Sequence, residues 1–153
     1  MTVDHVRIPV GVETFDARVS GPPDGPLVLL LHGFPQTSAM WRRLLDALGA
    51  AGFRAVAPDQ RGYSPAARPA DDDRYVLDRL VADVLAVADE MGGHTFHLVG
   101  HDWGGMVAWR LAQRHPQRLR TLTVLSTPHP AALGRALAGE DGSDQRRRSA
   151  YVA

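Results

Sequence analysis

The chain has 153 residues, of which 44% are hydrophobic and 22% charged, and its basic and acidic residues balance to a net charge of zero. This composition is typical of a soluble globular domain. A neutral chain has no basic field to attract nucleic acid or an acidic membrane, so we expect neither as a partner. It contains no cysteine, which excludes a disulfide framework and a thiolate metal site. We expect no metal and no cofactor.

The sequence shows no signal for export or for membrane insertion. Its start, MTVDHVRIPVGVETF, lacks a basic segment followed by an apolar one, as a secretory leader would have. No apolar run approaches the roughly 18 residues that are needed to span a bilayer. We therefore expect a cytoplasmic protein.

The first 31 residues predict strands. Residues 3–10 and 14–19 alternate between apolar and polar side chains on either side of Gly11, which predicts a hairpin of half-buried strands. Residues 27–31, LVLLL, form a continuous apolar run. Such a run is typical of a strand that is covered on both faces.

Helices and strands are predicted to alternate after this run. One helix is expected from Ser38 until Gly52 closes it, a second from the acidic residues 71–73, and a third over 104–115. The strands expected among them are residues 53–57, 96–99 and 121–125. This alternation predicts an α/β fold, with a mostly parallel sheet and helices on both faces. In such folds the sites lie beyond the carboxyl ends of the strands.

The segment GHDWG has the clearest chemical meaning. Its G-x-D-x-G pattern matches a nucleophile elbow with Asp102 in the usual serine position. Gly100 and Gly104 suit this turn, because the elbow holds its nucleophile clear of the sheet in a strained conformation. An ordinary aspartate turn is the alternative. The motif follows a buried strand and opens a helix, however, which favours a catalytic carboxylate.

The segment HGFP follows the LVLLL strand. In enzymes with this elbow, the corresponding loop supplies one main-chain N–H of the oxyanion hole, and the residue after the nucleophile supplies the other. The sequence therefore predicts an oxyanion hole made by the amides of Phe34 and Trp103. His32, Gly33 and Pro35 are predicted to shape the turn.

Four segments taken together resemble a known family. In chain order they are HGFPQTSAMWR, PDQRGYS, GHDWGG and STPHPAAL, and they are similar to the α/β-hydrolase superfamily and, more narrowly, to its epoxide hydrolase branch. The resemblance covers only the first half of a family member. It implies that residues 1–128 form the N-terminal part of a hydrolase core, truncated after its sixth strand. Residues 129–153 would begin an incomplete cap region.

The resemblance implies chemistry on a small apolar epoxide. Asp102 would attack an epoxide carbon and form an alkyl–enzyme ester, which an ionised carboxylate does without a base. The family's base histidine and acid follow the cap, and no histidine here matches that base. Tyr151 resembles a cap tyrosine that binds the epoxide oxygen, with Trp103 beside the substrate, although a chance tyrosine is an equal alternative.

Three other interpretations remain open. Haloalkane dehalogenases share GHDWG but usually carry a polar, halide-contacting residue at the position of Phe34. Fluoroacetate dehalogenases carry arginine at the position of Trp103. A chain without its own base could also be a non-catalytic fragment or part of a split assembly.

The resemblance also implies a strand order. In that order the apolar strand at 121–125 would lie at the open edge of the sheet, where a seventh strand should pair. An exposed apolar edge predicts self-association, as aggregation or pairing with another chain, or else a marginal fold.

Overall fold

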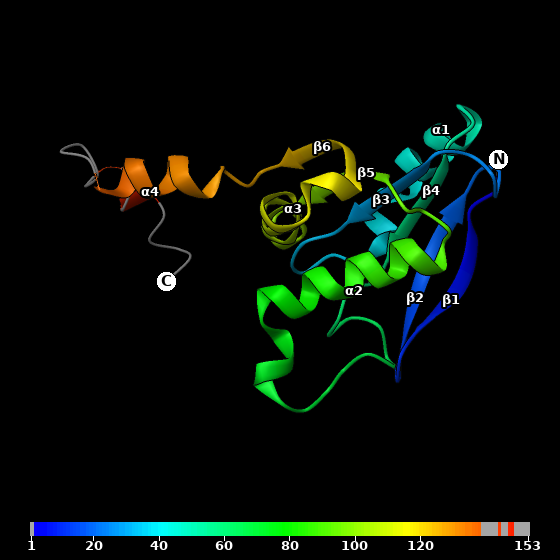
Figure 1. The fold of residues 1–153 in the computed structure, drawn as a ribbon, viewed down its shortest axis with the longest axis horizontal. Helices are drawn as coiled ribbons and strands as arrows, with labels where there is room; N and C mark the ends of the chain where they lie inside the picture. The colour runs from blue at the N-terminus through cyan, green and yellow to red at the C-terminus, as the bar shows by residue number, and fades with distance from the viewer. Residues whose placement is uncertain (1, 139–143, 145–146, 149–153) are drawn as a thin grey trace.

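A six-stranded sheet forms the centre of the fold (Figure 1), in a computed structural model that describes residues 2–138, 144, 147 and 148. The strands lie in the order β1-β2-β4-β3-β5-β6. Strands β1 and β2 form an antiparallel hairpin, β2 is antiparallel to β4, and the other pairs are parallel. The predicted α/β fold with a mostly parallel sheet is confirmed. The strands are β1 (Asp4–Val10), β2 (Glu13–Ser20), β3 (Leu27–Leu31), β4 (Arg54–Pro58), β5 (Phe96–His101) and β6 (Leu119–Leu125).

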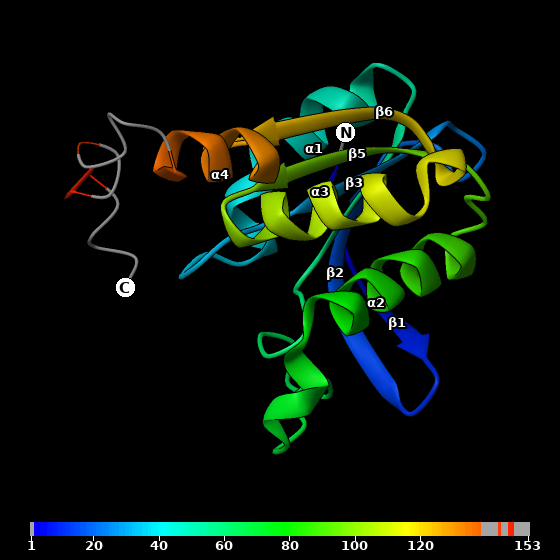
Figure 2. The ribbon, with the colours of Figure 1, turned by 60° about the vertical axis from the view of Figure 1, so that its left-hand side comes forward.

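Helices cover both faces of this sheet (Figure 2). Helix α1 (Arg42–Ala50) packs on one face, while α2 (Leu77–Glu90) and α3 (Trp103–Arg114) lie side by side on the other. Beyond β6, α4 (Pro130–Ala138) extends away from the sheet. Three short 3-10 helices complete the described elements: η1 (Ser38–Trp41), η2 (Asp72–Tyr75) and η3 (Pro116–Arg118).

The core explains why LVLLL forms a central strand. Leu27, Leu29 and Leu31 pack in the cluster with α2 and α3, whereas Val28 and Leu30 pack in the cluster with α1. Successive side chains of a strand point to opposite faces, so only a strand covered on both sides is apolar at every position. The predicted burial of β3 on both faces is therefore confirmed.

The predicted start of the second helix was wrong. Residues 72–75 form the separate helix η2, and Val76 is extended, with φ −66° and ψ 149°. Helix α2 therefore begins at Leu77, without a side-chain cap. The Tyr75 hydroxyl donates a hydrogen bond of 2.8 Å to the carbonyl of Pro69. This contact holds η2 against the preceding loop rather than in line with α2.

Strand β6 pairs with β5 and lies at one edge of the sheet. An unpaired strand edge presents free N–H and C=O groups to another chain. Self-association through β6 stays a prediction. Sedimentation velocity over a range of concentrations would test it, because the average mass should rise with concentration; a constant monomer mass would contradict it.

Candidate active site

The main chain is sharply bent at Asp102, between β5 and α3. Asp102 has φ 55° and ψ −119°, a conformation that non-glycine residues rarely adopt. Its amide donates to the carbonyl of Leu125 (3.2 Å), and its own carbonyl accepts hydrogen bonds from the Met106 amide (3.1 Å) and the Thr127 hydroxyl (2.8 Å). The strained turn is thus fastened to the end of β6 and to the first turn of α3. A strained turn between a strand and a helix is the backbone geometry that the predicted nucleophile elbow requires.

The Asp102 carboxylate meets the loop that follows β3. The main-chain N–H of Phe34 donates a hydrogen bond of 2.9 Å to Asp102 Oδ1. Among the described residues, no hydrogen bond joins this carboxylate to the Trp103 amide, the second donor that the sequence predicts. Trp103 begins α3, however, so its N–H has no acceptor within the helix. The structure therefore places one of the two predicted donors on the carboxylate, and the other at the adjoining helix end.

Glycines permit this close approach. A Cβ atom on Gly33 would collide with the Asp102 side chain, and one on Gly104 would collide with the main-chain oxygen of Leu31. A Cβ on Gly100 would likewise meet the main chain of Gly104. All three glycines named from the sequence thus lie where two segments touch. The Phe34–Pro35 peptide bond within this turn is cis.

Replacing Gly104 with alanine tests this packing. The added methyl group would push α3 away from β3, so we expect the free energy of unfolding to fall by about 1–3 kcal/mol, the usual cost of overpacking. Gly134 in α4 is the matched control, because a Cβ there meets nothing within 4 Å. Gly134→Ala should leave stability unchanged or raise it by up to about 1 kcal/mol. Urea denaturation of both variants measures the difference, and equal stabilities would refute the explanation.

His32 braces the turn from inside the protein. Its ring is fully buried, with Nδ1 3.0 Å from the Gly33 carbonyl oxygen and Nε2 3.0 Å from the main-chain nitrogen of Gln60. Because a main-chain N–H can only donate, Nε2 accepts and Nδ1 carries the proton. Burial lowers the pKa of His32, which favours this neutral form. These contacts support a role in shaping the turn rather than in proton transfer.

Three other histidines follow or precede Asp102 in the chain, and each has a different environment. His129 accepts the Ala131 amide at Nδ1 (3.2 Å), and its ring packs edge-on against Trp109. It thereby caps α4. His115 follows α3 at the far end from Asp102. His101 precedes Asp102 in β5, and its Nδ1 is buried without a partner among the described residues.

Tyr63 contributes to the site from the loop after β4. Its ring packs edge-on against His32, with the ring centres 4.6 Å apart. Burial raises the pKa of Tyr63, and the charge of Asp102 raises it further. The sequence predicts only that this loop leaves the same sheet edge. No local pattern identified Tyr63 or Gln60, because their partners lie about 30 residues away.

A groove of about 780 Å³ opens beside Asp102. Most of its wall is apolar, and the ion pair of Asp78 with Arg110, 2.6 Å between the nearest atoms, forms a polar side. The predicted substrate-contacting residue Trp103 lines this groove, whereas Tyr151 lies outside the described residues. The lining also includes Val76, Leu77, Met106, Trp109, Thr127, Pro128, His129 and Leu133.

Metal-binding clusters and membrane-spanning helices are both absent from the part of the chain that the structure describes. Within the described residues, no group of three or more histidine or acidic side chains could hold a metal ion. None of the helices in that part of the chain combines the length and apolar character that crossing a membrane requires.

Comparison with known proteins identifies the protein family to which this chain belongs. A sequence model described as the alpha/beta hydrolase fold matches residues 26–153, and this chain belongs to that family. Within the family, Epoxide hydrolase B of Mycobacterium tuberculosis is 43% identical over 139 residues, which cover 88% of this chain and 38% of the relative. The AB hydrolase superfamily protein YfhM of Bacillus subtilis is 40% identical over 117 residues, which cover 76% of this chain and 41% of the relative.

Solved structures agree with these sequence relatives. Epoxide hydrolase VrEH1 from Vigna radiata has 36% sequence identity and a TM-score of 0.78, covering 91% of this chain and 47% of that one. Epoxide Hydrolase A from Mycobacterium thermoresistibile has 34% identity and a TM-score of 0.78, covering 92% of this chain and 46% of that one. The resemblance to the N-terminal part of epoxide hydrolases is therefore confirmed. The chain spans less than half the length of each of these relatives.

Proposed function

We propose that this chain carries the nucleophile and part of the oxyanion hole of a hydrolase that opens epoxides. The observation that supports this most is the hydrogen bond from the Phe34 amide to Asp102 Oδ1, made at a strained elbow. It leaves Oδ2 as the oxygen that attacks the substrate. The relatives named as epoxide hydrolases support the choice of an epoxide.

The first step would be ester formation. Asp102 Oδ2 bonds to an epoxide carbon while the ring C–O bond breaks, and the ring oxygen becomes an alkoxide. The alkoxide takes a proton from a donor, for which Tyr151 is our candidate. No base is needed, because the carboxylate is already ionised at neutral pH. The apolar groove next to Trp103 would hold the body of the substrate.

The second step would be hydrolysis of the ester. Water adds to the ester carbonyl carbon, and the electron pair moves to Oδ1, which the Phe34 N–H already holds. Collapse breaks the bond from that carbon to Oδ2, and the departing oxygen takes the proton that the base removed from the water, which releases the diol. The new carboxyl group loses its remaining proton to solvent and is again a carboxylate. This step needs a general base. His32 is braced, His129 caps α4 and His115 is remote. His101 precedes the nucleophile in the chain, and its Nδ1 is buried. We therefore propose that the 153-residue chain stops at the ester.

Incubation with excess styrene oxide tests both steps. We expect one covalent adduct per chain, located at Asp102 by peptide mass spectrometry. Diol should not rise above the level formed without protein, since general-base help with ester hydrolysis is worth roughly a hundred- to ten-thousand-fold. Many equivalents of diol would refute the arrest at the ester. No adduct and no diol would favour a non-catalytic fragment or part of a split assembly.

Incubation with a haloalkane of similar size tests the alternative that the chain is part of a dehalogenase. A dehalogenase would form the same ester on Asp102 and release halide. Phe34 is 69% exposed at the site and offers no polar side chain to a leaving halide. We therefore expect halide release to stay at the level of the buffer. Release that matches adduct formation with styrene oxide would favour a dehalogenase.

A further inference from the structure

Gln60 makes two hydrogen bonds to His32, in the loop after β3 that also carries Phe34. Its main-chain N–H donates to His32 Nε2 (3.0 Å), and its side-chain Nε2 donates to the His32 carbonyl oxygen (2.5 Å). One bond sets the tautomer of the ring, and the other sets the orientation of the peptide that joins His32 to Gly33. Phe34, whose amide reaches Asp102, is the next residue along the chain.

The His32 carbonyl also holds the start of α3. It accepts a second hydrogen bond from the Gly104 amide at 3.1 Å. A single oxygen therefore joins the loop after β3, the loop after β4 and the helix that follows Asp102. Moving this peptide would move the Phe34 amide and the Asp102 turn relative to each other.

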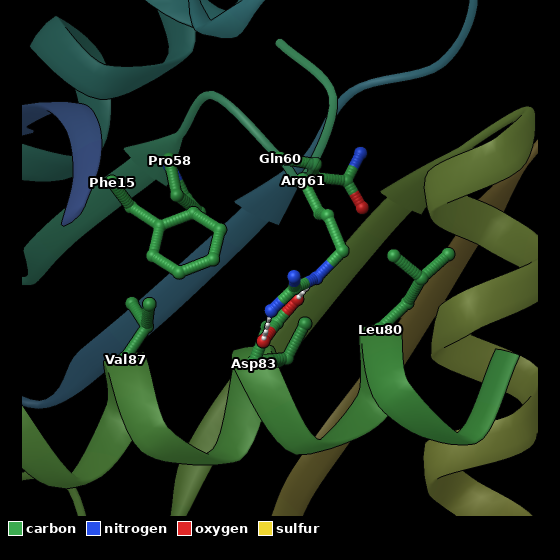
Figure 3. A pocket seen from close by; sticks show the side chains of 8 residues that line it. Phe15, Pro58, Gln60, Arg61, Leu80, Asp83 and Val87 are labelled. Atoms are coloured by element: carbon green, nitrogen blue, oxygen red, sulfur yellow. Dashed lines mark hydrogen bonds and ion pairs between the residues drawn. The ribbon is translucent and has the colours of Figure 1, made fainter. Parts of the chain in front are cut away.

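The loop that carries Gln60 is itself held firmly. The next residue, Arg61, is buried and makes two hydrogen bonds to Asp83 on α2, at 2.6 and 2.7 Å (Figure 3). In this view the Gln60 side chain leaves the loop in a different direction from Arg61. Asp59 donates its amide to the carbonyl of Asp16 at 2.8 Å. Gln60 is thus a short side chain on a fixed support, as a positioning group requires.

We propose that Gln60 is a positioning residue, which holds the Phe34 N–H on the Asp102 carboxylate. This inference rests on the proposed function for its catalytic consequence, but the hydrogen bond that it concerns is measurable without catalysis. Gln60 is not among the residues that line the groove, and its two hydrogen bonds reach His32 rather than Asp102, so it acts through His32. Removing its side-chain amide would loosen the Phe34–Asp102 contact and leave substrate binding in the groove unchanged.

The test compares Gln60→Met with Gln117→Met. Methionine keeps the length of glutamine and lacks the amide donor, and Gln117 is exposed in η3, far along the chain from the site. The first measurement is the Phe34 amide resonance in a ¹H–¹⁵N spectrum of the full chain. We expect its proton signal to shift upfield in Gln60→Met, toward that of a free amide, and to stay in place in Gln117→Met.

The second measurement is the rate of adduct formation with styrene oxide. We expect the rate at saturating epoxide to fall about tenfold in Gln60→Met, the factor that corresponds to about 1.4 kcal/mol. The epoxide concentration at half-maximal rate should not change. A general loss of structure would alter this concentration as well as the maximal rate. Both quantities should match the unaltered chain in Gln117→Met.

The outcomes separate this inference from the proposed function. If the unaltered chain forms no adduct, the proposed function fails, and the Phe34 resonance alone decides the role of Gln60. An unmoved Phe34 resonance in Gln60→Met overturns the inference, whatever the adduct rate. If Gln60→Met does not fold, Gln60→Glu replaces it, because glutamate keeps the length and the main-chain N–H but replaces the donor by an acceptor. The same upfield shift is then expected, and its absence is equally decisive.

Discussion

Asp102→Asn should abolish covalent labelling by styrene oxide. Asparagine has nearly the shape of aspartate, and its side-chain oxygen can still accept the Phe34 N–H. It also tolerates a positive φ better than most residues, so the elbow should survive. It lacks the negative charge that attacks the epoxide carbon. We expect the rate of adduct formation to fall by roughly 10⁴-fold or more, as for the loss of other catalytic nucleophiles.

Time-resolved mass spectrometry of the intact chain would measure this loss. The control is Asp24→Asn, which removes an exposed carboxylate that lies neither in the groove lining nor at the elbow. Its adduct rate should remain within about twofold of the unaltered chain, since substitutions at exposed positions away from a site change little. Labelling of Asp102→Asn at the original rate would show that another side chain is the nucleophile.

Arg61→Met should be the most destabilising substitution that we predict. The Arg61 side chain is only 3% exposed and is paired with Asp83 at 2.6 Å and with Glu13 at 2.7 Å. Its removal leaves two carboxylates, each 11% exposed, without their main counter-charge. Loss of one partner from a buried ion pair costs about 3–5 kcal/mol. We expect a decrease of this size in the free energy of unfolding, measured by urea denaturation at neutral pH.

Two control variants test whether loss of the buried ion pair causes the destabilisation of Arg61→Met. Arg43→Met removes an exposed arginine from α1 and should change stability by no more than about 0.5 kcal/mol. Arg61→Met combined with Asp83→Leu removes both members of the stronger contact, so it should recover part of the loss. A double variant that is less stable than Arg61→Met would contradict the ion-pair explanation.

The loss should also depend on pH. Burial raises the pKa of Asp83, and Arg61 opposes that rise. Without Arg61 the pKa of Asp83 in the folded chain rises further above its unfolded value, so folding takes up a proton as the pH falls. Stability of the variant is then greatest below the unfolded pKa and decreases as the pH rises through the folded one. The difference between Arg61→Met and the unaltered chain should therefore shrink between neutral pH and about pH 4.

Much of the fold could be read from local patterns. LVLLL predicts β3 with its observed ends, because a strand between two helical layers must be apolar at every position. GHDWG predicts a sharp strand–helix turn at Asp102, since only small neighbours permit the main chains to touch there. The second helix was placed too early, because the acidic residues before it looked like a cap. A contact between Tyr75 and Pro69 turns that segment aside, and no local pattern encodes it.

The candidate site, like the fold, was predictable only in part from the sequence. The motifs alone predict that Asp102, Phe34 and Trp103 meet at one sheet edge, because the turns that carry them follow parallel strands. Gln60, Tyr63 and the pairing of Arg61 with Asp83 emerge only when the chain is folded. Residue types and spacings predict the local conformation of each segment. A hydrogen bond between two remote segments depends instead on how the folded chain places those segments relative to each other. That placement is set by packing of the whole core, and it is what puts the Phe34 amide 2.9 Å from the carboxylate.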